Sequence, residues 1–138
     1  MGAPIQGPRR LRLLSGVAAA GCLVLGLAAQ GLDRSPLVDV VGSVLYVCSI
    51  GLLICVAWPR LSSIVIASLA FGFAVSVELI QLTGCPSAIA TVFPPARLLL
   101  GSAFDPLDLV AYGGGAFLLL VAHAGLTTLA RRPEVTEP

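Results

Sequence analysis

The sequence predicts an all-α membrane protein, a compact bundle of four transmembrane helices with both termini in the cytoplasm. Hydrophobic residues make up 57% of the chain and charged residues only 11%, whereas a soluble domain usually carries about 25% charged residues. Four apolar segments are long enough to span the lipid bilayer, because about 20 helical residues cross about 30 Å of hydrocarbon. The arginines gather on one side of these segments. With a net charge of +1 and no basic patch, we expect no nucleic-acid partner.

Caps and prolines delimit the predicted spans, which cover residues 11–30, 36–58, 62–83 and 106–130. Ser35 suits the N-cap of the second span, and Pro36 suits its first helical position. In the fourth span, Asp105 suits the N-cap and Pro106 suits the first helical position. We therefore expect an N-terminal tail, one membrane domain and a C-terminal tail, at residues 1–10, 11–130 and 131–138.

The distribution of arginine predicts the orientation, because cytoplasmic flanks collect basic residues near the ends of spans. Most of the eight basic residues lie on the side of the termini, namely Arg9, Arg10, Arg12, Arg60, Arg131 and Arg132, against Arg34 and Arg97 on the other side. The chain is then a multi-pass protein of the cell inner (plasma) membrane. Its long connection, residues 84–104, is extracytoplasmic. The apolar stretch "SAIATVFPPARLLLG" in this connection is expected to lie on the membrane surface or in the mouth of a pocket.

The cysteines and the single histidine are scattered, so we expect no metal site, no cofactor and no disulfide. Cys22, Cys48 and Cys55 lie within spans, where they act most simply as small hydrophobes, and Cys85 lies in the long connection. The start "RRLRLLSGVAAAGC" resembles a signal that is cleaved before Cys22. The apolar run continues beyond it, however, so we treat the first span as retained. His123 is expected to be a polar helix-packing residue, with a chemical role as the alternative.

One carboxyl group lies inside a predicted span, in the stretch "AVSVELIQL" of residues 74–82. An ionisable residue in a span is a functional-site hypothesis by default. Glu78 has no capping role, because it lies near a helix C-terminus, where the helix dipole disfavours negative charge. Gln81 is three residues further on and shares its face. We expect Glu78 to be protonated near neutral pH and to donate a hydrogen bond, either to the partner of Gln81 or to Asp108.

Further polar side chains open the second and fourth spans at the same level of the membrane. Asp39 begins the second span with Ser43 one turn further on, and Tyr112 follows Asp108 at i+4 in the fourth. A structural role is the alternative for two of these acids. Asp105 can cap a helix, and the helix dipole can stabilise the negative charge of Asp108 near the helix N-terminus. The predicted ligand-binding or polar cluster contains Glu78, Gln81, Asp108, Tyr112, Arg97, Asp39, Ser43 and Asp105. The neighbouring Gly113, Gly114 and Gly115 are expected to let another helix approach closely.

The segments "VELIQL" and "LLLGSAFDPLDLVAYGGG" resemble an uncharacterised bacterial membrane family, domain of unknown function 2809, which is similar in turn to VanZ-like proteins linked to teicoplanin resistance. The resemblance covers roughly residues 37–122. Its recurring positions fall on Glu78 and Gln81, on Gly101, Ser102 and Phe104, and on Asp108, Tyr112 and Gly115. This chain departs from the family pattern at Ser43, where an acid is expected, and at Ala103, where a glycine is expected.

Three classes of function remain open. The first in our ranking is a cell-envelope factor whose outward-facing polar pocket binds a lipid-linked or envelope-derived ligand. Arg97 would bind a phosphate or carboxylate, and the acids would bind amines or hydroxyls. The second is a structural subunit with a membrane protein partner, and the third is a small solute or proton-coupled carrier. Glu78 and Asp108 could act as acid and base, but no nucleophile, metal cluster or phosphate loop indicates a reaction, so we do not expect an enzyme.

Overall fold

The computed structural model describes residues 7–29, 31, 35–96 and 104–130. These residues form five helices and no strand: α1 (Gly7–Ala29), α2 (Pro36–Ala57), α3 (Ser63–Gln81), α4 (Cys85–Val92) and α6 (Pro106–Ala130). Four of them, α1, α2, α3 and α6, are long and apolar enough to cross a membrane. The predicted bundle of four membrane helices is therefore confirmed, and the chain is an integral membrane protein that crosses the bilayer several times.

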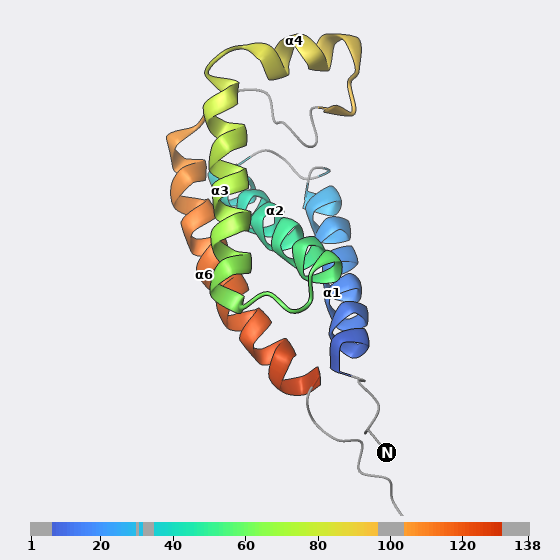
Figure 1. Ribbon diagram of the computed structural model, residues 1–138. Helices are drawn as coiled ribbons and strands as arrows, with labels where there is room; N and C mark the ends of the chain where they lie inside the picture. Colours follow the sequence, from blue (N-terminus) through green and yellow to red (C-terminus); the bar gives the residue numbers. More distant parts are fainter. Residues whose placement is uncertain (1–6, 30, 32–34, 97–103, 131–138) are drawn as a thin grey trace, which may run out of the picture.

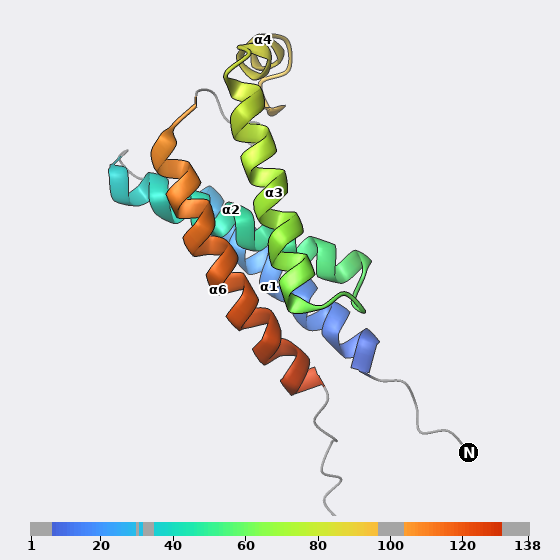
Figure 2. The ribbon, with the colours of Figure 1, turned by 60° about the vertical axis from the view of Figure 1, so that its left-hand side comes forward.

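The helix α2 occupies the middle of the bundle. It packs against α1, α3 and α6, while α1 and α3 each pack against α2 and α6. The start of α1 and the end of α6 lie at one end of the molecule, and α4 lies at the other (Figures 1 and 2). We call these the opposite end and the α4 end. The α4 end is the level at which α3 ends and α6 begins.

Local capping determines where the helices begin. Ser35 Oγ accepts a hydrogen bond from the backbone N–H of Val38 at 3.3 Å, and Asp105 Oδ1 accepts one from the backbone N–H of Leu107 at 2.9 Å. Both bonds satisfy backbone donors that the first turn of a helix leaves without a partner. The helix α1 begins at Gly7, inside the segment predicted as the N-terminal tail. The rest of that tail, residues 1–6, and the C-terminal tail, residues 131–138, lie outside the described residues.

The connection after α3 contains the short helix α4. Gly84 has φ +72°, a left-handed conformation that glycine adopts without steric cost, and the chain changes direction there. In Figure 1 α4 crosses above the end of α3, and in Figure 2 it is seen along its axis. Val92 and Phe93 are 87% and 60% exposed. An apolar helix across the end of a membrane bundle is typical of a segment that lies in the membrane interface.

The helices α2 and α6 come close together at Gly115. A Cβ atom on this residue would lie 3.1 Å from the carbonyl oxygen of Val44 and 3.3 Å from Cβ of Val47. Gly113 and Gly114 are exposed, and a Cβ on either would meet no atom within 4 Å. Of the three glycines predicted to pack against a helix, only Gly115 therefore lies against one among the described residues, because the other two point away from α2.

Candidate functional site at the α4 end

Polar groups from α2, α3, α6 and the residue that precedes α6 meet at the α4 end. We call them the carboxyl cluster, which consists of Ser43, Glu78, Asp105, Asp108 and Tyr112. Three spans contribute to it, as the level of these residues along the membrane normal predicted. The contacts inside the cluster differ from those that we expected, however, and they change the role of each residue.

Glu78 joins the end of α3 to the beginning of α6. Its side chain is fully buried, with 0% exposure. Oε1 accepts a hydrogen bond from the backbone N–H of Asp105 at 2.6 Å, and Oε2 accepts one from the hydroxyl of Tyr112 at 3.2 Å. We expected Glu78 to donate a hydrogen bond, for example to Asp108, but both of its oxygens accept. The reason is the position of α6, because the backbone N–H of Asp105 just before this helix and the phenol of Tyr112 in its second turn lie against the end of α3.

Asp108 joins α6 to α2. Its Oδ1 accepts a hydrogen bond from Ser43 Oγ at 2.5 Å, and its side chain is half-buried. Ser43 is the position at which the family pattern led us to expect an acid. In this chain a hydroxyl donor stands there, and it binds the carboxyl group of the neighbouring helix instead of repelling it.

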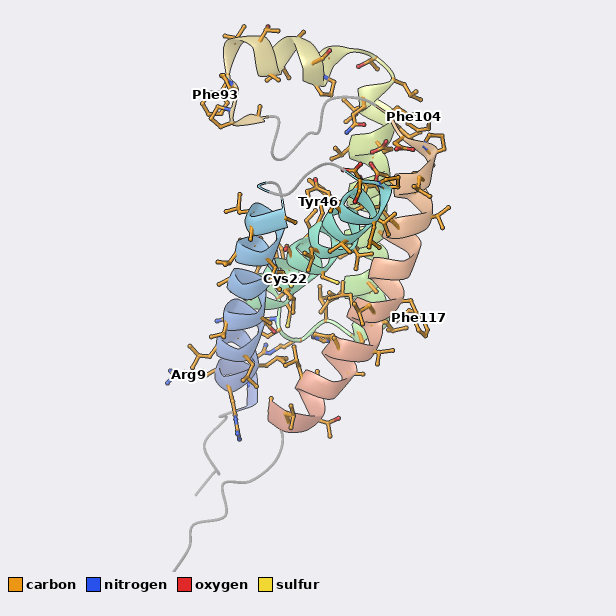
Figure 3. The ribbon with its side chains drawn as sticks, turned by 180° about the vertical axis from the view of Figure 1, so that it is seen from behind. Arg9, Cys22, Tyr46, Phe93, Phe104 and Phe117 are labelled. Carbon is orange, nitrogen blue, oxygen red and sulfur yellow. The ribbon has the colours of Figure 1, made fainter. Side chains whose placement is uncertain are left out.

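Asp105 takes part in the cluster through its backbone. Its exposed side chain caps α6 at Leu107, while its N–H binds Glu78. Tyr112 packs against a second tyrosine, Tyr46 of α2, with ring centroids 6.2 Å apart and ring planes inclined by 42°. Figure 3 shows Tyr46 within the bundle near the α4 end, and it shows Phe104 just before the start of α6.

The other predicted site residues are less enclosed. Asp39 is exposed in the first turn of α2. Gln81 is half-buried as the last residue of α3. Arg97 lies outside the described residues.

Charge is separated along the bundle. Asp39, Glu78, Asp105 and Asp108 lie at the α4 end, on the first turns of α2 and α6 and the last turn of α3. The described basic residues are at the opposite end, namely Arg9, Arg10 and Arg12 near the start of α1 and Arg60 in the turn between α2 and α3. In Figure 3 Arg9 points away from the bundle at that end. The α4 end is therefore acidic within the described part of the chain.

A family model described as "Protein of unknown function (DUF2809)" matches residues 32–116. The chain belongs to this family. No curated protein and no solved structure matches it. The matched part of this DUF2809 protein contains all of the carboxyl cluster, together with α2, α3 and α4. It ends before the last part of α6 and does not include α1.

A second polar group lies nearer the opposite end, and part of it falls outside the segment matched by the DUF2809 family. His123 Nδ1 lies 2.8 Å from Ser63 Oγ, and His123 Nε2 lies 3.1 Å from Cys55 Sγ. Ser15 Oγ donates a hydrogen bond to Cys55 Sγ at 3.2 Å. We call this group the histidine cluster, and each of the four spans supplies one of its residues.

The sequence predicts that His123 is a polar helix-packing residue, and its contacts with Cys55 and Ser63 are of this type. The sequence does not indicate these two partners. Cys55 and Ser63 are separated from His123 by 68 and 60 residues, and no short motif links them. A polar residue deep in a span was the one available signal. The described residues contain no group of three His, Cys, Asp or Glu side chains that could hold a metal ion.

Proposed function

We propose that this DUF2809 protein is a cell-envelope factor of the inner (plasma) membrane. Its carboxyl cluster would face the extracytoplasmic side and bind a lipid-linked or envelope-derived ligand. The observation that carries this proposal is the state of Asp108. Its Oδ1 accepts a hydrogen bond from Ser43, and among the hydrogen bonds of the described residues none ends on its Oδ2. This half-buried carboxyl group can therefore accept a hydrogen bond from an amine or hydroxyl group of a ligand.

The composition of the cluster supports a binding role over a purely structural one. Apolar residues of similar volume stabilise a helix bundle as well as a buried polar group does, or better. A polar cluster on three spans therefore gives the bundle no more stability than apolar packing would. The acidic charge at the α4 end also favours a ligand with an ammonium group, because the described arginines lie at the other end.

The position of α4 supports a ligand from the membrane interface. This apolar helix lies across the same end of the bundle as the carboxyl cluster (Figure 1). A lipid headgroup at that level would lie beside both α4 and Asp108. The extracytoplasmic orientation rests on the distribution of arginine, most of which lies on the side of the termini.

The test uses the purified protein and lipids that differ only in the headgroup. Phosphatidylethanolamine offers an ammonium donor, phosphatidylglycerol offers hydroxyl donors, and phosphatidylcholine offers neither. A ligand present at 100 times its dissociation constant stabilises the folded state by about 2.7 kcal/mol. We expect one of the two donor lipids to raise the unfolding temperature more than phosphatidylcholine does.

Two variants show whether the effect arises at the cluster. Asp108→Asn keeps an oxygen for Ser43 but loses the charge, and we expect it to abolish the difference between lipids. Val110→Ala changes a side chain on the same helix that is 73% exposed, and it should keep the difference. Equal stabilisation by the three lipids, or an unchanged difference in Asp108→Asn, would contradict the proposal.

A role as a structural partner subunit is the second candidate, and one observation favours it. Gly113 and Gly114 are exposed on α6, where a Cβ would meet no atom within 4 Å. Small residues on the surface of a membrane helix allow a helix of another protein to approach closely. If this candidate is correct, Gly114→Leu should reduce the mass of the complex in mild detergent, measured by light scattering. An unchanged mass would exclude an interface at this position.

A further inference from the structure

The histidine cluster has no part in the function proposed above, and it brings a thiol against an imidazole inside the bundle. Cys55 has 0% exposure, as have His123 and Ser15. The thiol has a hydroxyl donor on one side, from Ser15, and an imidazole nitrogen on the other. The imidazole is in turn held by Ser63, which is half-buried at the first turn of α3.

One assignment of protons satisfies all of these contacts. Ser15 donates its hydroxyl proton to Cys55 Sγ, and Cys55 donates its thiol proton to His123 Nε2. The proton on His123 Nδ1 is then donated to Ser63 Oγ. In this arrangement the lone pair of Nε2 points at the thiol, because the ring proton is on Nδ1 and is donated to Ser63.

These are the relationships that activate a cysteine for nucleophilic attack. An activated nucleophile has a base within about 2.6–3.2 Å, and a third group orients the base. Here Cys55 is the nucleophile, His123 is the base at 3.1 Å, and Ser63 is the orienting group at 2.8 Å from the imidazole. Because Cys55 is enclosed by the four spans, with 0% exposure, a bulky or charged reagent is excluded.

We propose that Cys55 is a modification site that reacts with small uncharged oxidants of the peroxide class. His123 Nε2 takes the thiol proton, and the sulfur attacks one oxygen of hydrogen peroxide. The O–O bond breaks, and the departing hydroxide takes the proton from His123 and leaves as water. The sulfur is oxidised to a sulfenic acid and the peroxide is reduced. Ser63 acts as a positioning residue in this step.

The chain contains its own control. Cys48 lies in the same helix and is also buried, with 7% exposure. Its Sγ, however, donates to the backbone carbonyl of Gly115 at 3.6 Å, and a carbonyl oxygen cannot take a proton from a thiol. Any difference in peroxide reactivity between Cys48 and Cys55 therefore measures the effect of the base rather than of burial.

The test treats the purified full chain with hydrogen peroxide for increasing times and then removes the peroxide with catalase. Unfolding in detergent with dimedone follows, so that each sulfenic acid is trapped regardless of burial, and fragment-ion mass spectrometry assigns the adduct to a cysteine. We expect Cys55 to react at least about tenfold faster than Cys48, since a positioned base typically contributes about 10²–10⁴-fold.

His123→Gln keeps a hydrogen-bonding side chain but removes the base, and we expect it to lower the rate at Cys55 to the rate at Cys48. Ser63→Ala should lower it by a smaller factor, with the rate at Cys48 unchanged in both variants. Equal rates at the two cysteines of the wild type overturn the proposal, and so does a folded His123→Gln protein with the wild-type rate. If His123→Gln does not fold, the wild-type comparison and Ser63→Ala decide.

Discussion

The Oε1 atom of Glu78 accepts a hydrogen bond from the backbone N–H of Asp105 at 2.6 Å, across 27 residues of the chain. This bond closes the loop that contains α4, because it ties the last part of α3 to the residue that caps α6. The buried carboxyl group that first suggested a binding site is therefore also the group that fixes where the chain returns to the bundle.

Replacing Glu78 should destabilise the fold. Glu78→Ala leaves the N–H of Asp105 and the hydroxyl of Tyr112 without their acceptor, and an unsatisfied buried group costs about 1–3 kcal/mol. Glu78→Gln retains one acceptor oxygen, so we expect a smaller loss. Thermal unfolding in detergent measures both, with Ser76→Ala on the exposed face of α3 as the control. An unchanged unfolding temperature in Glu78→Ala would show that the bond to Asp105 does not hold the loop.

The two aspartates at the start of α6 should respond differently to substitution. Asp105→Ala removes the cap at Leu107, which costs about 0.5–2 kcal/mol. Asp108→Asn keeps an oxygen acceptor for Ser43, so its unfolding temperature should stay close to that of the wild type, while lipid discrimination is lost. If Asp108→Asn is the less stable of the two, the roles of the two residues are reversed.

Adjacent glycines on α6 provide a sharp test of the packing between α2 and α6. Gly115→Ala places a Cβ 3.1 Å from the carbonyl oxygen of Val44, and overpacking of this kind costs about 1–3 kcal/mol. Gly114→Ala meets no atom within 4 Å, and alanine is the better helix former by about 1 kcal/mol. We therefore expect Gly115→Ala to lower the unfolding temperature and Gly114→Ala to leave it unchanged or raise it. Equal effects would mean that α2 and α6 do not approach at Gly115.

The orientation can be tested at Cys85, which is exposed as the first residue of α4. Cys48 and Cys55 are buried and Cys22 is half-buried, so a membrane-impermeant maleimide should react mainly with Cys85. We expect labelling in intact cells whose outer envelope has been made permeable, and we expect a tag fused after Pro138 to be protected. Labelling of the tag without Cys85 would reverse the topology. Cys85→Ser is the control for labelling at other sites.

Hydropathy and local chemistry predicted the elements of this fold. A membrane span is a local property, since about 20 apolar residues are enough to define it, and the caps at Ser35 and Asp105 act within their own first turn. The long connection was predicted only in part. Its apolar character indicated the membrane interface but not the helix α4, which begins directly after Gly84.

Amino-acid sequence alone determined the spans, the level of the acidic residues and the family. Tertiary structure decided which side chains meet. Glu78 binds the backbone of Asp105 and the hydroxyl of Tyr112, rather than Asp108, because of the position of α6 beside α3. His123 meets Cys55, 68 residues away, by the same kind of long-range packing. A helix presents several faces to the membrane, and only the crossing of neighbouring helices determines which face meets protein and which meets lipid.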